Sequence, residues 1–302
     1  MSAAVRTFRE RLAAGEVLVG DGGWGTMLMA RGLRPGEPPE SLTFASPGVI
    51  EEVARLYVEA GADLVTTNTF GGSPLRLRAF GLDGRTDEIN RAAVEALRRA
   101  VGTRALVSAS IGPSGHLREP YGDVSAADLA ESFARQVRAL ASAGVDAFCV
   151  ETMTDLEEAR LAVEAARAAA PGTPVIATMT FERSRRGFFT VMGASVEQAA
   201  HVLAAAGADL VGSNCGNGID TMVEVARAFR AVTAAPLAIQ ANAGLPESRD
   251  GALVYPEPPE QFAAAVPALL EVGVRLIGGC CGTTPAHVRA MRTAVDAARR
   301  PG

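Results

Sequence analysis

The sequence predicts an α/β protein, a (β/α)8 TIM barrel in a single domain, on three observations. A unit made of a helix end, a glycine and a short apolar run recurs four times, at 60–69, 143–152, 206–215 and 272–281. Four more apolar runs alternate with these units, at 17–20, 105–110, 174–180 and 236–241. Each of the eight runs is followed by a loop and an amphipathic stretch, which is the alternation of an eightfold barrel.

The eight apolar runs have the character of parallel strands. In the recurring unit, written AGADLVTTNT or AGADLVGSNC, the glycine suits the left-handed residue that ends a helix. The run that follows is apolar at odd and even positions alike, as in a strand buried on both faces. An open doubly wound sheet would share this pattern. The count of eight units favours the barrel instead, as one domain over 1–302 with its core at 17–299.

Helical periodicity is clearest at 50–60, 126–143, 155–169 and 285–299. Asp155 stands where an N-cap is expected, and Glu157 and Glu158 follow in the first turn, where the helix dipole favours negative charge. Two polar, proline-rich tracts, at 34–40 and 246–260, are expected to be loops after strands. In a barrel such loops surround the mouth of the active site.

The composition narrows the class of protein. Of 302 residues 48% are hydrophobic and 21% charged, enough apolar material for a large core. The net charge of −5 argues against a nucleic-acid partner. All 29 basic residues are arginine, which excludes Schiff-base lysines and the P-loop. No run approaches the ~20 apolar residues of a membrane span, and the N-terminus lacks a signal-peptide core. We therefore expect no membrane partner. Four cysteines are too few for a disulfide scaffold, so we expect a cytoplasmic protein.

Three of the four cysteines follow predicted strands. Cys215 ends the sixth strand, and Cys280 and Cys281 end the eighth. Carboxyl ends of barrel strands share one rim, so the three sulfurs are expected to converge. Three thiolates form a soft ligand set that favours zinc and leaves a fourth tetrahedral position for substrate. A vicinal disulfide or plain buried thiols are the alternatives.

Other polar side chains are expected at the same rim. Asp21 and Glu151 follow the first and fourth strands, and they are candidates to hold a cationic group such as a substrate ammonium. Asn68 and Ser110 end the second and third strands, and are further candidates for binding substrate.

The remaining cysteine and the histidines point less directly to chemistry. Cys149 lies inside the apolar run DAFCV and is interpreted as a packing residue. His116 follows the third strand on the active side and stays a candidate. His201 and His287 lie on predicted helices, where surface or packing roles are expected.

Two readings from other classes stay open. Residues 20–25 match G-x-G-x-x-G after a strand, the fingerprint of a nicotinamide oxidoreductase, but no acidic residue follows about 20 residues later at the end of a second strand. A non-catalytic barrel that binds zinc or thiols would also satisfy the cysteine pattern.

Several strings together resemble the homocysteine S-methyltransferase family, with a match from about 17 to 291: DGGWGTML, TNTFGG, VGSNCGNG, QANAGLP and GGCCGTTPAHVRAM. The resemblance implies a barrel that binds one Zn²⁺ through Cys215, Cys280 and Cys281. In some members the asparagine of the NAG motif, here Asn242, ligates zinc when substrate is absent. It also implies that Glu151 and Asp21 hold the amino group of homocysteine.

The implied reaction moves a methyl group onto the thiol of L-homocysteine and forms methionine. The donor is then a small sulfonium such as S-methylmethionine, or a methyl-corrinoid on a separate protein. The TNTF and DGGxGT strings look more like the homocysteine domain of cobalamin-dependent methionine synthase than like betaine–homocysteine methyltransferase. An alternative is therefore a thiol-acceptor subunit of a multi-protein corrinoid and folate system.

Overall fold

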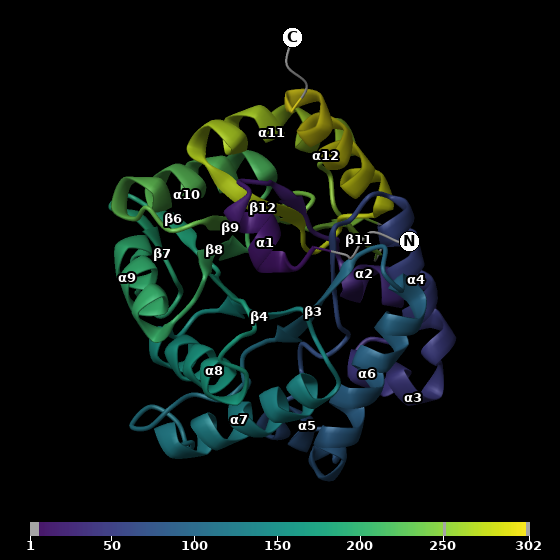
Figure 1. Ribbon diagram of the computed structural model, residues 1–302. Coiled ribbons are helices and arrows are strands. Elements are labelled where there is room, and N and C mark those ends of the chain that lie inside the picture. Colours follow the sequence, from purple (N-terminus) through teal and green to yellow (C-terminus); the bar gives the residue numbers. More distant parts are fainter. Residues whose placement is uncertain (1–5, 250–251, 300–302) are drawn as a thin grey trace.

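The computed structural model describes residues 6–249 and 252–299, and within them eight parallel strands form one barrel (Figure 1). The strand order is β1-β12-β9-β8-β5-β4-β3-β2, and a parallel bridge between Gly20 and Leu64 joins the first strand to the second. The predicted (β/α)8 fold is confirmed. The barrel strands are β1 (Leu18–Val19), β2 (Leu64–Thr66), β3 (Leu106–Ile111), β4 (Ala147–Met153), β5 (Val175–Met179), β8 (Leu210–Asn214), β9 (Leu237–Ala241) and β12 (Val274–Gly279).

Helices surround the barrel and alternate with its strands (Figure 1). The helix that follows β4 begins, as predicted, with Asp155 as N-cap, whose carboxylate accepts hydrogen bonds from the backbone N–H groups of Glu157 and Glu158. The helices are α1 (Phe8–Ala13), α2 (Trp24–Met29), α3 (Leu42–Ala45), α4 (Pro47–Glu59), α5 (Pro74–Arg78), α6 (Thr86–Val101), α7 (Ala126–Ser142), α8 (Leu156–Ala169), α9 (Val196–Ala206), α10 (Ile219–Val232), α11 (Pro259–Val272) and α12 (Pro285–Ala298), with short 3₁₀ turns at Pro39–Ser41 and Asp83–Arg85.

The lumen of the barrel is packed with side chains. One buried cluster takes apolar residues from all eight strands, among them Leu18, Leu64 and Cys149. Phe8 of α1 belongs to the same cluster, and Figure 1 shows α1 lying across one end of the barrel. Cys149 is 2% exposed, in keeping with its interpretation as a packing residue. A second, larger cluster lies between the barrel and its helices.

At the end where the strands begin, the aspartate of the recurring unit clamps neighbouring strands together. Asp209 accepts a hydrogen bond from the Val175 N–H (2.8 Å) and pairs with Arg9 and Arg167. The Asp63 carboxylate accepts a hydrogen bond from the Val19 N–H (2.8 Å) and pairs with Arg11 and Arg292. The Asp146 carboxylate accepts a hydrogen bond from the Val107 N–H (2.7 Å) and pairs with Arg98. This end of the barrel is therefore held by part-buried hydrogen bonds from backbone N–H groups to aspartate side chains, which the neighbouring arginine charges reinforce.

The structure differs from the expected loops in two places and from an expected strand end in a third. The tract 246–260 contains a hairpin, β10 (Glu247–Arg249) and β11 (Ala252–Val254), and β6 (Glu182–Ser184) pairs with β7 (Gly187–Phe189) after β5. Strand β4 continues to Met153 through a bulge in which Thr152 has φ of +58°. Such a bulge re-aims side chains at a strand end.

Among the described helices, none is long and apolar enough to cross a bilayer.

Candidate functional site

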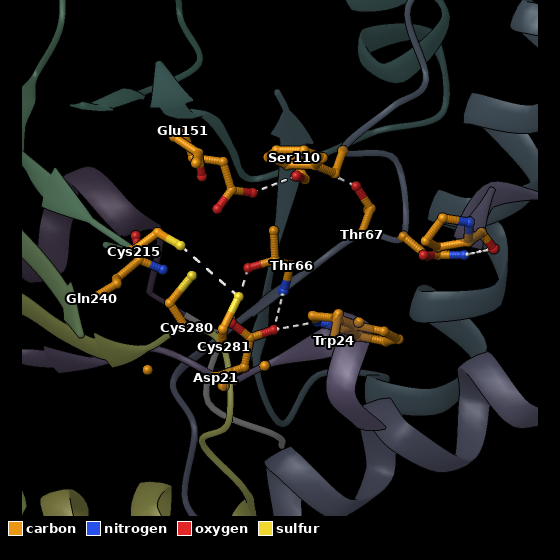
Figure 2. A pocket seen from close by; sticks show the side chains of 18 residues that line it. Asp21, Trp24, Thr66, Thr67, Ser110, Glu151, Cys215, Gln240, Cys280 and Cys281 are labelled. Atoms are coloured by element: carbon orange, nitrogen blue, oxygen red, sulfur yellow. Dashed lines mark hydrogen bonds between the residues drawn. The ribbon is translucent and has the colours of Figure 1, made fainter. Parts of the chain in front are cut away.

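The structure brings the sulfurs of Cys215, Cys280 and Cys281 together at the carboxyl ends of β8 and β12 (Figure 2). The three Sγ atoms lie within 4.8 Å of one another, and those of Cys215 and Cys281 are 3.9 Å apart. A tetrahedral ion with Zn–S bonds of about 2.3 Å separates its sulfurs by about 3.8 Å. The thiols therefore have the spacing of a zinc ligand set.

The backbone has a positive φ at Cys215 and at Gly282, and these conformations orient the cysteine side chains. Cys215 has φ of +60°, a left-handed conformation rare outside glycine, held by its N–H bond to the Gln240 carbonyl (3.1 Å). Gly282 has φ of +79° and turns the chain after the cysteine pair. The Thr283 hydroxyl donates to the Cys280 carbonyl (2.7 Å), and a Cβ on Gly279 would lie 2.2 Å from that hydroxyl oxygen. The flanking glycines thus permit the bend that the sequence led us to expect.

The hydrogen bonds among the three thiols shift their pKa values in different directions. The pKa of Cys215 lies well below its ordinary value, because the Cys280 and Cys281 thiols donate hydrogen bonds to its sulfur. The pKa of Cys280 and of Cys281 is raised, first of all by their hydrogen bonds with Cys215. The hydrogen bonds from the two neighbouring thiols therefore favour the thiolate form of Cys215, and a thiolate favours cation binding.

Asn214, directly before Cys215, is a site residue to which sequence reasoning gave no role. Its buried Oδ1 accepts from the Thr152 N–H (2.7 Å) and the Thr178 hydroxyl (2.8 Å). Its Nδ2 donates to Thr152 Oγ1 (2.7 Å) and contacts Cys280 Sγ at 3.8 Å. One amide thus fixes the bulge of β4 relative to a cysteine sulfur. Its place before a strand-end cysteine was visible, but its partners depend on the tertiary fold.

A cavity of about 240 Å³ opens beside the sulfurs, lined by residues that include Asp21, Glu151, Asn68 and Ser110. Glu151 and Ser110 lie side by side in its wall, and the Ser110 hydroxyl donates a hydrogen bond to the Glu151 carboxylate (Figure 2). Burial, outweighing that hydrogen bond, raises the pKa of Glu151 to about 7, and the charges of Asp21 and Cys215 add to the effect. Glu151 is therefore a carboxylate that gains from a cationic partner.

Asp21 is occupied by groups of the protein itself. Its Oδ2 accepts from Trp24 Nε1 (2.8 Å) and the Thr66 N–H (2.7 Å), and its Oδ1 accepts from the Thr66 hydroxyl (3.0 Å) (Figure 2). Burial still raises the pKa of Asp21 to about 6. Asp21 therefore anchors the Trp24 ring in the cavity wall and links β1 to β2, while its charge adds to the negative potential there.

The proline-rich tract 34–40 reaches the cavity, as expected of a loop at the mouth. Asn68 Nδ2 donates to the Pro39 carbonyl (2.7 Å), and the Gly71 N–H donates to Glu40 Oε1 (2.5 Å). Pro39 itself lines the cavity. Asn68 thus holds a wall of the cavity through its own protein contact.

The glycine-rich loop packs closely instead of forming an open cradle. A Cβ on Gly22 would lie 2.7 Å from Thr283 Oγ1, and one on Gly23 would lie 2.7 Å from the Cys280 carbonyl oxygen. Here the glycines let the first loop approach the cysteine turn.

Among the histidines, His116 lies outside the cavity, with its Nδ1 3.7 Å from Asp123 Oδ1. His287 caps α12 through Thr284, in a structural role.

Comparisons with known proteins agree with this architecture. Residues 18–295 match the family described as homocysteine S-methyltransferase. Methionine synthase of Mycobacterium tuberculosis is 32% identical over 94% of the chain, and that of Mycobacterium leprae is 31% identical over 93%. The chain spans about a quarter of the length of these relatives, 25% and 24%. The metallated homocysteine methyltransferase MmuM of Escherichia coli has a TM-score of 0.79 and 26% identity, covering 94% of this chain and 98% of that one.

The family match covers nearly the whole barrel, including both strand ends that carry the clustered cysteines. The chain belongs to the homocysteine S-methyltransferase family.

Proposed function

We propose that the protein transfers a methyl group to the thiol of L-homocysteine, forming methionine, with a zinc ion held by Cys215, Cys280 and Cys281, and that 17–299 form one homocysteine-binding unit. The observation that carries this proposal is the opening of three sulfurs within 4.8 Å of one another onto a cavity that also holds Glu151. The family assignment supports an enzyme over a non-catalytic thiol-binding barrel.

The residues present fit a zinc ion. Three soft thiolates suit zinc, and their spacing suits its tetrahedral geometry. The Oδ1 of Asn242 is buried and has no hydrogen-bond partner among the described residues, which supports Asn242 as a ligand in the absence of substrate. Bound zinc would supply a Lewis acid that makes an incoming thiol a thiolate at neutral pH.

The chain's own residues bind and orient the substrate. Glu151 binds the homocysteine ammonium, and Ser110 orients the carboxylate through its hydrogen bond. Asp21 adds negative charge nearby and keeps Trp24 in place, while Asn68 fixes the loop that walls the cavity. The substrate sulfur gives its electron pair to the methyl carbon, and the bond from that carbon to the donor breaks. No base acts at carbon, which suits a site without lysine. Positioning of this kind can contribute about 7–11 kcal/mol.

The donor of the proposed reaction is a small sulfonium such as S-methylmethionine or S-adenosylmethionine. Trp24 and Phe70 line the cavity, and aromatic faces attract cations. The likeness of this chain to MmuM, which is titled a homocysteine methyltransferase and is covered to 98%, supports methyl transfer to homocysteine on a barrel of this kind.

A second candidate is methyl transfer from a methyl-corrinoid on a separate protein, with this chain as the thiol-acceptor subunit. It is favoured by exposed apolar side chains on the loops after β2, β3, β5 and β9, since exposed apolar groups gathered near a site mark docking surfaces. These side chains are Phe70, Leu117, Val191, Met192, Leu245 and Leu253.

One assay separates the candidates. Purified, zinc-loaded protein is mixed with homocysteine and with each donor separately: S-methylmethionine, S-adenosylmethionine, and free methylcobalamin as the corrinoid probe. Methionine formed from a sulfonium alone supports the first proposal and removes the need for a partner. Methionine from methylcobalamin only supports the second. No methionine with any of the three contradicts the self-contained enzyme.

A further inference from the structure

The bulge of β4 that carries Glu151 lies outside the hydrogen-bonded ladder of the barrel. Pairing of β4 with β5 stops at Val150 and resumes only at Met153, and pairing with β3 ends at Val150. Among the described strand pairs, Glu151 and Thr152 therefore have no partner on either side. Thr152 also has φ of +58°, a conformation that persists only when its surroundings hold it. The support for this backbone must come from a side chain.

The amide of Asn214 supplies that support from β8. Its Oδ1 accepts a hydrogen bond from the Thr152 N–H (2.7 Å), and its Nδ2 donates to Thr152 Oγ1 (2.7 Å). The same Oδ1 accepts from the Thr178 hydroxyl (2.8 Å). Because a backbone N–H can only donate, the amide oxygen must face Thr152, and this fixes the orientation of the buried amide.

The second amide hydrogen of Asn214 points to the cysteine cluster, since Nδ2 lies 3.8 Å from Cys280 Sγ. All four hydrogen-bonding positions of the amide are thereby occupied. The backbone is held as well, because the Asn214 carbonyl accepts from the Thr180 hydroxyl (3.0 Å). A buried polar group that is satisfied at every position is rigid. Asn214 therefore ties the backbone next to Glu151 to a sulfur of the cluster in a fixed geometry.

We propose that Asn214 is a positioning residue that sets the distance between the Glu151 carboxylate and the cysteine sulfurs, and thereby selects thiol substrates by chain length. The inference rests on the proposed function, in which Glu151 binds the ammonium of homocysteine and the cysteine cluster, through its ion, binds the substrate sulfur. The two ends of the substrate are then held separately, at β4 and at the ends of β8 and β12. Cysteine has one methylene fewer and does not reach both ends. A loose bulge would let the carboxylate move toward the shorter substrate.

The test compares the dissociation constants of L-homocysteine and L-cysteine, measured by isothermal titration calorimetry on zinc-loaded protein, with the zinc content checked after each titration. Asn214→Ala removes every link made by the amide. Thr152→Val keeps the shape of the side chain and the Asn214–Cys280 contact, and removes only the acceptor of one bond. Asn90→Ala is the matched control, because Asn90 is also fully buried and its amide donates to two backbone carbonyls.

A second measurement needs neither zinc nor substrate. Hydrogen exchange of the Thr152 amide in metal-free protein, followed by NMR, reports on its bond to Asn214. In Asn214→Ala this amide should exchange about tenfold faster, as expected from the loss of one hydrogen bond. The amide of Val107, which donates to Asp146 at the other end of the barrel, should keep its rate and so separates a local effect from general destabilisation.

Wild-type protein is expected to prefer homocysteine by about 10–200-fold, the range that one methylene gives in a binding pocket. Asn214→Ala should lower this preference about tenfold, Thr152→Val by a smaller factor, and Asn90→Ala should leave it unchanged. An equal loss of affinity for both thiols in Asn214→Ala, or an unchanged exchange rate at Thr152, would overturn the inference and leave the proposed function intact.

If Asn214→Ala does not fold, Thr152→Val decides, because an unchanged preference in that variant also overturns the inference. Wild-type protein that binds neither zinc nor homocysteine would overturn the proposed function together with the inference.

Discussion

The Ser110 hydroxyl at the end of β3 donates a hydrogen bond to the Glu151 carboxylate at the end of β4. The two strands are neighbours, so this contact fixes the carboxylate over the cavity next to the cysteine cluster. Even with this donor, burial keeps the pKa of Glu151 near 7. The ionisation of Glu151 is therefore sensitive to small changes around it.

Ser110→Ala should move the acid limb of the kcat/KM profile for homocysteine to higher pH. Removing the hydroxyl removes an interaction that lowers the pKa of Glu151, and only the carboxylate attracts the substrate ammonium. Ser108→Ala is the matched control, because its buried hydroxyl on the same strand has no partner among the described residues. Superimposable profiles for Ser110→Ala and wild type would contradict the role of this contact.

Glu151→Gln should stabilise the fold while abolishing homocysteine binding. Because the folded-state pKa is raised from 4.5 to about 7, the folded protein binds more protons than the unfolded chain between these pH values. The unfolding free energy thus falls as pH rises through this window and is then constant. Glu151 is partly exposed to the cavity, so we expect a gain of about 1–3 kcal/mol at pH 8 and little at pH 4. Urea titrations at both pH values measure it; an equal gain at both would refute this origin.

Wild-type protein should contain about one zinc per chain, and Cys280→Ala or Cys281→Ala should lose it. Each substitution leaves two sulfurs, too few for the proposed ligand set. Cys149→Ala is the control: this cysteine lies in the barrel lumen, so its loss should lower stability by about 1 kcal/mol through a cavity and leave zinc unchanged. Elemental analysis of purified protein gives the stoichiometry, and fully active metal-free wild type would refute the zinc proposal.

Asp209→Ala should lower the unfolding free energy by about 1–3 kcal/mol, because it leaves the Val175 N–H without its hydrogen bond and removes a partner of Arg167. The proposed active site lies at the opposite end of the barrel, so kcat/KM of the folded protein should not change. Asp123→Ala, at a carboxylate that is 86% exposed, should stay within about 0.5 kcal/mol of wild type. Equal stabilities of the two variants would contradict the clamp.

The sequence predicts best those features that can be located relative to the predicted strands. Eight apolar runs predicted the barrel, and the placement of Cys215, Cys280 and Cys281 after two of them predicted convergence, because all strand ends share a rim. The residues around the cysteine turn depend instead on contacts distant in sequence: the Tyr255 ring lies over Gly282 only because the chain folds back after a hairpin. The sequence predicts a loop at this hairpin, because the three-residue strands are too short to show alternation. The bulge at Thr152 left no local signal, since a positive φ outside glycine is held by tertiary contacts such as those from Asn214.

The aspartate clamps divide the barrel into pairs of adjacent strands. Asp63 links β2 to β1, Asp146 links β4 to β3, and Asp209 links β8 to β5, whereas the fourth recurring unit carries Arg275 at the matching place. Circular permutation should therefore succeed best between pairs. New ends at the turn before β3 would leave both strands of each clamped pair on the same side of the cut.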